Sequence, residues 1–409
     1  MAGILFLKRE NIMRTLCQLI LMGILSYSFG SYTASAQSRV ILSDSMWVSA
    51  DEVPLLHAQF TQGSRYNFTR QELVKWQADQ PTTTYDLTQK LSETGIRCII
   101  EQPEKILALD YPDRVLAFEA EKQKVYKLRS TLEGTSYDIF NPSASSGVYL
   151  PDLNALAFFV VPIGTMEENL FTSPEFYRGA PLVGFFRLKG RKAELFRVIG
   201  QRDSIYWTRG GVLPHVLHVN FSLHPDGQSI FISQNPVARV ERYSLQGELL
   251  ASFGEEAKHA TEDTIIAIPP SLYTKRRETV YRFWATTYLD MYTDSAQMRL
   301  YRRYYIGKPL PVAPDSVAKP EPERPPNVCW FDPYLDSIIN AMPLDQYGLQ
   351  VYDIREHTPV LLHDVLLPRK LKLMHTDADR LIFAGRKEDG YWLYEGKIVA
   401  SRRKGQVDH

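Results

Sequence analysis

Three histidines and one asparagine lie close together in the segment 214–224, which reads PHVLHVNFSLH. His218 and Asn220 are two residues apart, so in a β-strand their side chains point to the same face, whereas His215 points to the other face unless the strand bends. Imidazole nitrogens and amide oxygens bind metal ions and polar ligands. The segment therefore predicts either a ligand or metal site or a row of polar side chains that faces water.

The sequence contains none of the catalytic motifs that carry a specific mechanism. It has no G-x-S-x-G, H-E-x-x-H, P-loop, EF-hand loop or paired C-x-x-C motif. We therefore assign no catalytic residues and no metal ligands from motifs alone.

The elements that must position these side chains follow a period of two. Apolar and polar residues alternate over 217–223, and Pro225-Asp226-Gly227 then provides a turn. A second strand is predicted at 229–233, and two more at 239–245 and 248–253 around Gln246-Gly247. Four antiparallel strands within about forty residues are typical of one blade of a β-propeller.

The terminal hairpin of this unit, Arg239–Gly254, recurs along the chain. The clearest copy is Leu182–Gly200, with a turn at Lys189-Gly190 and a closing glycine in the matching place. Four weaker copies are predicted at Arg114–Leu128, Met298–Gly307, Leu349–Val365 and Tyr391–Ser401, with upstream partner strands at 153–161 and 379–385. The pattern predicts an all-β chain built from repeated four-stranded antiparallel blades.

The unit 214–254 resembles the blades of six-bladed propellers of the NHL and TolB-like kind. The matching residues are the HPDGQ turn at 224–228, the strand SIFIS at 229–233, Tyr243 to Gly247, and the closing Ser252–Gly254. The whole chain is also similar to uncharacterised exported bacterial propellers. The resemblance implies six blades, with seven as the alternative, and it concerns the fold, which does not determine function.

The resemblance also implies where a site would lie. In such propellers the first strand of each blade lines a central channel, which makes His215, His218, Asn220 and Asn235 candidate ligand-binding residues. Related lactonase-like hydrolases hold a Ca²⁺ ion in the channel with Glu, Asn and Asp side chains, for which Asn141, Asn220, Asn235 and Asp290 are candidates here. Asp290 and Asp294 also fit turns between strands.

The N-terminus reads as an export signal. Arg14 precedes an apolar run, Leu16–Leu25, and the small residues Ala34 to Ala36 fit a cleavage site before Gln37. We expect residues 1–36 to be a signal peptide and 37–409 to form a single propeller domain, exported to the periplasm or cell envelope. The apolar run is shorter than the roughly 20 residues of a membrane span, so no stable membrane insertion is expected.

The charge composition argues against nucleic acid as a partner. The 47 basic and 47 acidic side chains leave no net charge, so no bulk charge draws the chain to nucleic acid. Cys98 and Cys329 would remain after cleavage, either as a disulfide or as two separate thiols.

Four further features complete the expected organisation. Insertions are predicted near 163–180 and, in a proline-rich segment, near 307–327. Helix is predicted only at Gln71–Gln77 and within the first insertion. An N-terminal strand, from Arg39–Leu42 or Ser45–Val48, is expected to complete the last blade beside the C-terminal hairpin.

Two functions are compatible with these features. The first is an exported module that binds a protein, peptide or glycan without catalysis, because a rigid scaffold with long loops is the usual arrangement for recognition. The second is a metal-dependent hydrolase or lyase with a site in the channel, for which Ca²⁺ is the candidate ion.

Overall fold

The computed structural model describes residues 38–49, 59–139, 147–163, 177–208, 219–260, 286–307 and 347–400, with short gaps in the second, fourth and last ranges. The chain divides into two units, one formed by Met1–Ser38 with Ala400–His409 and the other by Arg39–Val399. The second unit is described below. Its described residues are almost all in β-strands, turns and connections, and they include the short helix α3 (Ile205–Thr208) and a 3₁₀ turn (Pro151–Leu153).

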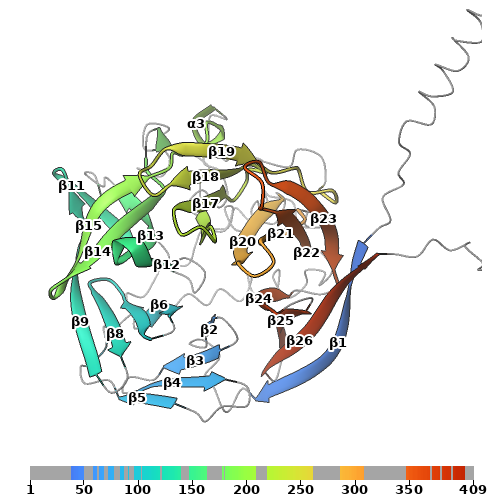
Figure 1. Cartoon of the computed structure of the whole chain (residues 1–409), viewed down its shortest axis with the longest axis horizontal. Helices are drawn as coiled ribbons and strands as arrows, with labels where there is room; N and C mark the ends of the chain where they lie inside the picture. The colour runs from blue at the N-terminus through green and yellow to red at the C-terminus, as the bar shows by residue number, and fades with distance from the viewer. Residues whose placement is uncertain are drawn as a thin grey trace, which may run out of the picture. The chain divides into compact units, whose positions relative to one another are not determined.

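The unit contains four separate four-stranded sheets (Figure 1). The first is β2 (Gln59–Thr61), β3 (Ser64–Phe68), β4 (Glu72–Gln77) and β5 (Thr83–Asp86). The second is β16 (Val219–Leu223), β17 (Ser229–Gln234), β18 (Val240–Ser244) and β19 (Leu249–Phe253). The third is β20 (Thr287–Asp294), β21 (Arg299–Tyr305), β22 (Tyr347–Asp353) and β23 (Val360–Leu367). The fourth is β1 (Ser38–Ser49), β26 (Gly390–Ala400), β25 (Arg380–Lys387) and β24 (Lys372–Asp377).

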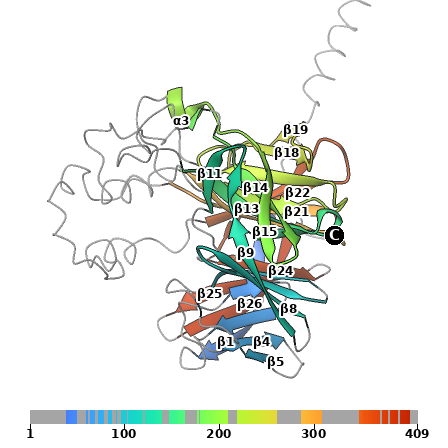
Figure 2. The same cartoon turned by 90° about the vertical axis from the view of Figure 1, so that its left-hand side faces the viewer.

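A ten-stranded sheet combines two further antiparallel groups. One group is β6 (Ile96–Glu101), β7 (Ile106–Asp110), β8 (Arg114–Glu119) and β9 (Lys122–Arg129). The other is β12 (Gly147–Leu150), β13 (Ala155–Pro162), β14 (Val183–Lys189) and β15 (Lys192–Ile199), extended by β10 (Thr131–Leu132) and β11 (Thr135–Ile139). A short parallel pairing between β9 and β15 joins the two groups, which Figure 2 shows side by side.

Neighbouring sheets pack through aromatic and branched side chains. Phe231 contacts Phe253 with ring centroids 5.7 Å apart, and Phe253 contacts Tyr352 of the next sheet at 5.4 Å. Both contacts are edge-on, an arrangement that aromatic pairs favour. Similar clusters join the other sheets that follow one another in sequence. The abundant Tyr and Phe therefore fill the spaces between sheets, because both faces of most strands are buried.

The inner edge strands of the sheets also contact one another. β6 lies against β2 and β12, and β16 lies against β12 and β20. β24 lies against β20 and β2. The predicted closing strand is confirmed, because β1 covers both N-terminal candidate segments and lies beside β26.

Four of the six predicted hairpins are confirmed, as β8–β9, β14–β15, β18–β19 and β22–β23. Gly254, which closes the β18–β19 hairpin, has a φ of 110°. A Cβ atom at this position would lie 2.3 Å from the carbonyl oxygen of Ala238, so only glycine fits.

Two predicted hairpins are wrong, because each segment forms one strand. Met298–Gly307 contains β21, which pairs with β20 and β22 along its whole length. Strand β26 (Gly390–Ala400) covers this segment as far as Ala400, and Gly396 makes no turn within it. A Cβ atom at Gly396 would lie 2.9 Å from Phe383 Cε2 and 3.2 Å from Val40 Cγ1, so this glycine permits close packing within a strand.

The predicted helix at Gln71–Gln77 is also wrong. Glu72–Gln77 is strand β4, which pairs with β3 and β5, and Leu73 is fully buried. Pairing on both edges outweighs the local preference for helix in so short a segment. The sheet β2–β5 was not expected from the sequence.

Several predictions lie outside the described residues. They concern the signal segment, most of the insertions near 163–180 and 307–327, and Cys329. Cys98 is buried in β6. Within the described ranges, no helix has the length and apolarity needed to cross a bilayer.

Candidate ligand-binding cavity

A cavity of about 480 Å³ lies where inner edge strands of several sheets meet. Strands β6, β12, β16, β20 and β24 contribute to its lining, together with parts of β21 and β22. A ligand there would contact several sheets at once. This volume lies in the usual range for small-molecule and cofactor sites.

The lining contains an ion pair between Asp290 and Arg303. The two residues are directly opposite on β20 and β21, beside a bulge. Arg303 Nε donates to Asp290 Oδ1 at 3.0 Å, and Arg303 Nη2 donates to Oδ2 at 2.9 Å. Arg303 Nη1 donates to the carbonyl oxygen of Leu371 at 2.9 Å. This two-point geometry fixes both side chains, which are each 13% exposed.

His224 lies at the end of β16, at another part of the lining. Burial lowers the pKa of His224, the nearby charge of Arg242 lowers it further, and Asp226 opposes the shift. The backbone N–H of Asp226 donates to His224 Nδ1 at 3.1 Å. The imidazole is therefore mainly neutral at neutral pH, with Nδ1 also 3.0 Å from Asp226 Oδ2.

Asp226 fixes the turn that positions His224. Its Oδ1 accepts hydrogen bonds from the backbone N–H groups of Gln228 at 2.8 Å and Ser229 at 3.1 Å, and Arg242 Nη2 donates to its Oδ2 at 2.6 Å. Burial raises the pKa of Asp226, but these hydrogen bonds and His224 outweigh it and hold the pKa below its usual range. The HPDGQ residues therefore stabilise a turn, and the contact between Asp226 and Arg242 joins this turn to β18.

The other polar groups of the lining are also bound within the protein. Glu101 lies 2.5 Å from Lys75 Nζ. The Tyr149 hydroxyl donates to Asn154 Oδ1 at 2.9 Å and accepts from Lys105 Nζ at 3.0 Å. The charged groups that line the cavity are therefore paired or neutral, and the rest of the lining consists mainly of aliphatic, aromatic and hydroxyl side chains.

The structure describes two of the four predicted ligand residues and brings them together. Asn220 Nδ2 donates to Asn235 Oδ1 at 2.9 Å and to the carbonyl oxygen of Tyr288 at 3.1 Å. The backbone N–H of Tyr288 donates to the carbonyl oxygen of Asn235 at 3.0 Å. Both side chains are buried and neither lines the cavity, so in this structure they connect two sheets. His215 and His218 lie outside the described residues.

The residues considered for Ca²⁺ do not converge. Asp290 is paired with Arg303, Asn220 and Asn235 form the buried contact above, and Asn141 lies outside the described residues. Within the described part of the chain, no three His, Cys, Asp or Glu side chains lie close enough to hold a metal ion. The described residues therefore do not fit this ion.

The alternative interpretation of Asp290 as a turn residue is wrong. Asp290 lies inside β20, whereas Asp294 does fix the following turn through a 3.0 Å hydrogen bond from Gln297 N to its Oδ1. Sequence reasoning also missed Glu101, Tyr149 and Arg303 as lining residues. A search for polar residues at the ends of strands could have found some of these residues, but the sequence did not show which strands would pair and face the cavity.

No family model matches the chain, and no curated protein matches it. Solved structures are similar to it. One is a member of the DUF4221 family from Bacteroides vulgatus, with a TM-score of 0.54 and 9% identity over 90% of this chain and 99% of that one. The all-β sheets and this match are consistent with a β-propeller. At this identity the match concerns the fold alone.

A second similar structure is regucalcin, a calcium-binding protein from Agrobacterium tumefaciens. It has a TM-score of 0.40 and 12% identity over 87% of this chain and 95% of that one.

Proposed function

We propose that this protein is an exported six-bladed β-propeller that binds a protein, peptide or glycan, with a segment of the ligand held in the cavity. The single observation that carries the proposal is the cavity itself, which is lined by inner strands of several sheets. A site at the meeting point of rigid elements positions its side chains well for recognition.

Six blades are supported by the contacts between inner strands. Each of β2, β6, β12, β16, β20 and β24 contacts the next, and β24 contacts β2. Each is an edge strand of a four-stranded antiparallel group once the β9–β15 pairing and the short strands β10 and β11 are set aside.

The paired charges of the lining favour an uncharged polar ligand segment. Arg303 uses Nε, Nη1 and Nη2 within the protein, and Asp290 accepts at both oxygens. A charged ligand group would have to break these contacts. The hydroxyls of Ser222 and Thr293 also line the cavity and lie 2.7 Å apart in a hydrogen bond with each other. Because each hydroxyl can make more than one hydrogen bond, a neutral hydroxyl or amide group of a ligand can bind to them without breaking an ion pair.

Measuring how the protein binds to arrays of neutral oligosaccharides and peptides would test the proposal. Ser222→Tyr places a ring in the cavity, and we expect it to abolish binding of the ligands that wild type retains, with the melting temperature nearly unchanged. Thr131→Tyr, at an exposed position of β10, is the matched control and should bind as wild type does. Equal binding by both variants would exclude the cavity as the site.

Export is tested separately. Mass spectrometry of the protein recovered from the cell envelope should give an N-terminus at Gln37. An intact N-terminus on a protein found in the cytoplasm would contradict this part of the proposal.

A further inference from the structure

Four basic residues form a row across four adjacent strands at the junction of β9 and β15. Arg114 is directly opposite Lys127, Lys127 is opposite Lys192, and Lys192 is opposite Lys189. Residues directly opposite on neighbouring strands point to the same face, and the strands are about 4.8 Å apart. We call these four residues the basic row.

The basic row faces outward. The next pair in the junction, Leu128 and Ala193, points the other way and packs in the core, whereas Lys127, Lys189 and Lys192 are exposed. Figure 2 shows β9 and β15 side by side on this surface.

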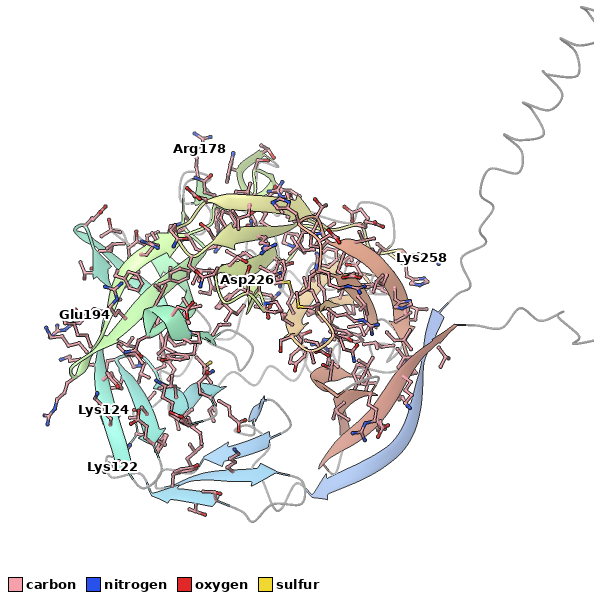
Figure 3. The ribbon with its side chains drawn as sticks, viewed as in Figure 1. Lys122, Lys124, Arg178, Glu194, Asp226 and Lys258 are labelled. Carbon is pink, nitrogen blue, oxygen red and sulfur yellow. The ribbon has the colours of Figure 1, made fainter. Side chains whose placement is uncertain are left out.

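More positive charge surrounds the basic row. Arg129 and Arg187 are both opposite Glu194, so one carboxylate lies between two exposed guanidinium groups. Lys122 and Lys124, at the start of β9, are also exposed, but they alternate with Lys127 and belong to the opposite face of the strand, where Lys124 Nζ lies 4.7 Å from the centre of the Tyr126 ring. Figure 3 shows them on the same side of the unit as Glu194, away from Arg178 and Lys258.

The protein neutralises only part of this charge. Arg114 pairs with Asp110, and Lys192 Nζ lies 3.3 Å from Glu194. Among the residues that the structure describes, Lys127 and Lys189 have no acidic group within 4 Å. Like charges directly opposite on neighbouring strands are destabilising, so the fold gains nothing from this arrangement.

Protection of a strand edge does not explain the lysines at this position. Lysines often prevent an exposed edge from pairing with another chain. Here the edge is already occupied, because β9 pairs with β15 and Lys127 N donates to the carbonyl oxygen of Arg191 at 2.9 Å. An external partner with repeated negative charge would neutralise the basic row.

We propose that the basic row binds an anionic glycan, a polysaccharide with carboxylate or sulfate groups. This site is separate from the cavity and goes beyond the function proposed above. Cations repeated at strand spacing on an exposed sheet surface suit a linear polymer that crosses the strands, with its charges over successive lysines.

The same surface suits other polyanions less well. Proteins that bind single-stranded nucleic acid stack bases on aromatic rings. Here the Phe196 ring is covered by Arg187 at 4.2 Å, and Tyr126 is buried. A membrane-binding surface would add exposed apolar side chains, but the large ones among the described residues lie on other strands, such as Leu249 and Val360.

Titration of the full protein with dextran sulfate and with polygalacturonate, at several salt concentrations, tests the proposal. Lys127→Gln/Lys189→Gln should weaken binding of at least one polymer by about tenfold or more and reduce the salt dependence, because fewer counterions are released. The matched control is Arg178→Gln/Lys258→Gln, which removes two exposed charges elsewhere and should change affinity less than about twofold.

Three results would overturn the proposal. In the first, neither polymer binds to wild type. In the second, the two double variants lose the same amount of affinity. In the third, single-stranded DNA or anionic lipid vesicles bind more tightly than the polymers, and this binding is lost in Lys127→Gln/Lys189→Gln. Ser222→Tyr should retain polymer binding, so failure of the cavity proposal and failure of this one give different results.

Discussion

The cavity and the basic row both place charged residues opposite one another on neighbouring strands, but the cavity has unlike charges on antiparallel strands, whereas Lys127 and Lys192 are like charges on parallel strands. Asp290 and Arg303 are directly opposite on neighbouring strands, as are Lys127 and Lys192. In the cavity the opposed pair has unlike charges and satisfies itself through two hydrogen bonds. On the outer surface the opposed pair has like charges, and although Lys192 contacts Glu194, Lys127 has no acidic group within 4 Å among the described residues. Equivalent cross-strand positions can therefore serve stability in one region and binding in another.

The largest expected effect comes from breaking the cavity pair. Arg303→Met leaves the largely buried carboxylate of Asp290 without its partner, and we expect a loss of about 3 kcal/mol of unfolding free energy, measured by urea denaturation. Adding Asp290→Asn to Arg303→Met removes the unpaired charge, and the double variant should regain a large part of the lost unfolding free energy. A stability equal to wild type in Arg303→Met would show that the pair is dispensable.

A second effect is expected in acid. The pKa of His224 is lowered in the folded state, so the unfolded chain binds a proton first, and stability falls as the pH drops below about 6.5. His363, whose pKa is lowered by burial and then by Arg299, acts in the same direction. His224→Gln/His363→Gln should flatten the pH dependence of the melting temperature between neutral pH and pH 5. An unchanged slope would contradict the assignment of neutral imidazoles.

A smaller effect of opposite sign is expected at the basic row. Lys127→Glu places a carboxylate opposite Lys192 and Arg114, and we expect a gain of about 0.5 kcal/mol in unfolding free energy. Added salt should stabilise wild type more than this variant, because salt screens the repulsion between the like charges. The same variant should lose affinity for anionic polymers. Lower stability in Lys127→Glu would show that the lysines do not repel one another.

The smallest effect is expected from metal ions. Since Asp290 and Asn220 are engaged within the protein, adding Ca²⁺, Zn²⁺ or Mn²⁺, or removing them with a chelator, should leave the melting temperature unchanged. A clear increase with one ion would favour the metal-dependent hydrolase or lyase, because a ligand that binds only the folded state stabilises it.

Local patterns predicted four hairpins correctly, and in two of them, β14–β15 and β18–β19, strand alternation and a turn glycine agreed. Gly247 and Gly254 have positive φ angles, as the turns around them require. The prediction failed where a glycine had another role, as at Gly396, and where a short segment was compatible with both helix and strand, as in β4.

The candidate site was less predictable. Asn220 and Asn235 were both candidate ligand-binding residues, and the structure brings them together, yet their contacts connect two sheets. Asp290 is found in the cavity lining only because β20 bulges and pairs with β21 at Arg303. This contact depends on strand register, which alternation of residue types does not specify.

The sequence by itself determined that the chain is all-β and that short strands are joined by glycine turns, because alternation and turn geometry are local properties. Tertiary structure alone decided in which register the strands paired and which hairpins became neighbours. It therefore decided that Asp290 would meet Arg303 in a cavity and that Lys127 would meet Lys192 on the surface. The reason is physical: such contacts join strands that can be far apart in the chain, and they form only when whole sheets bury their faces together.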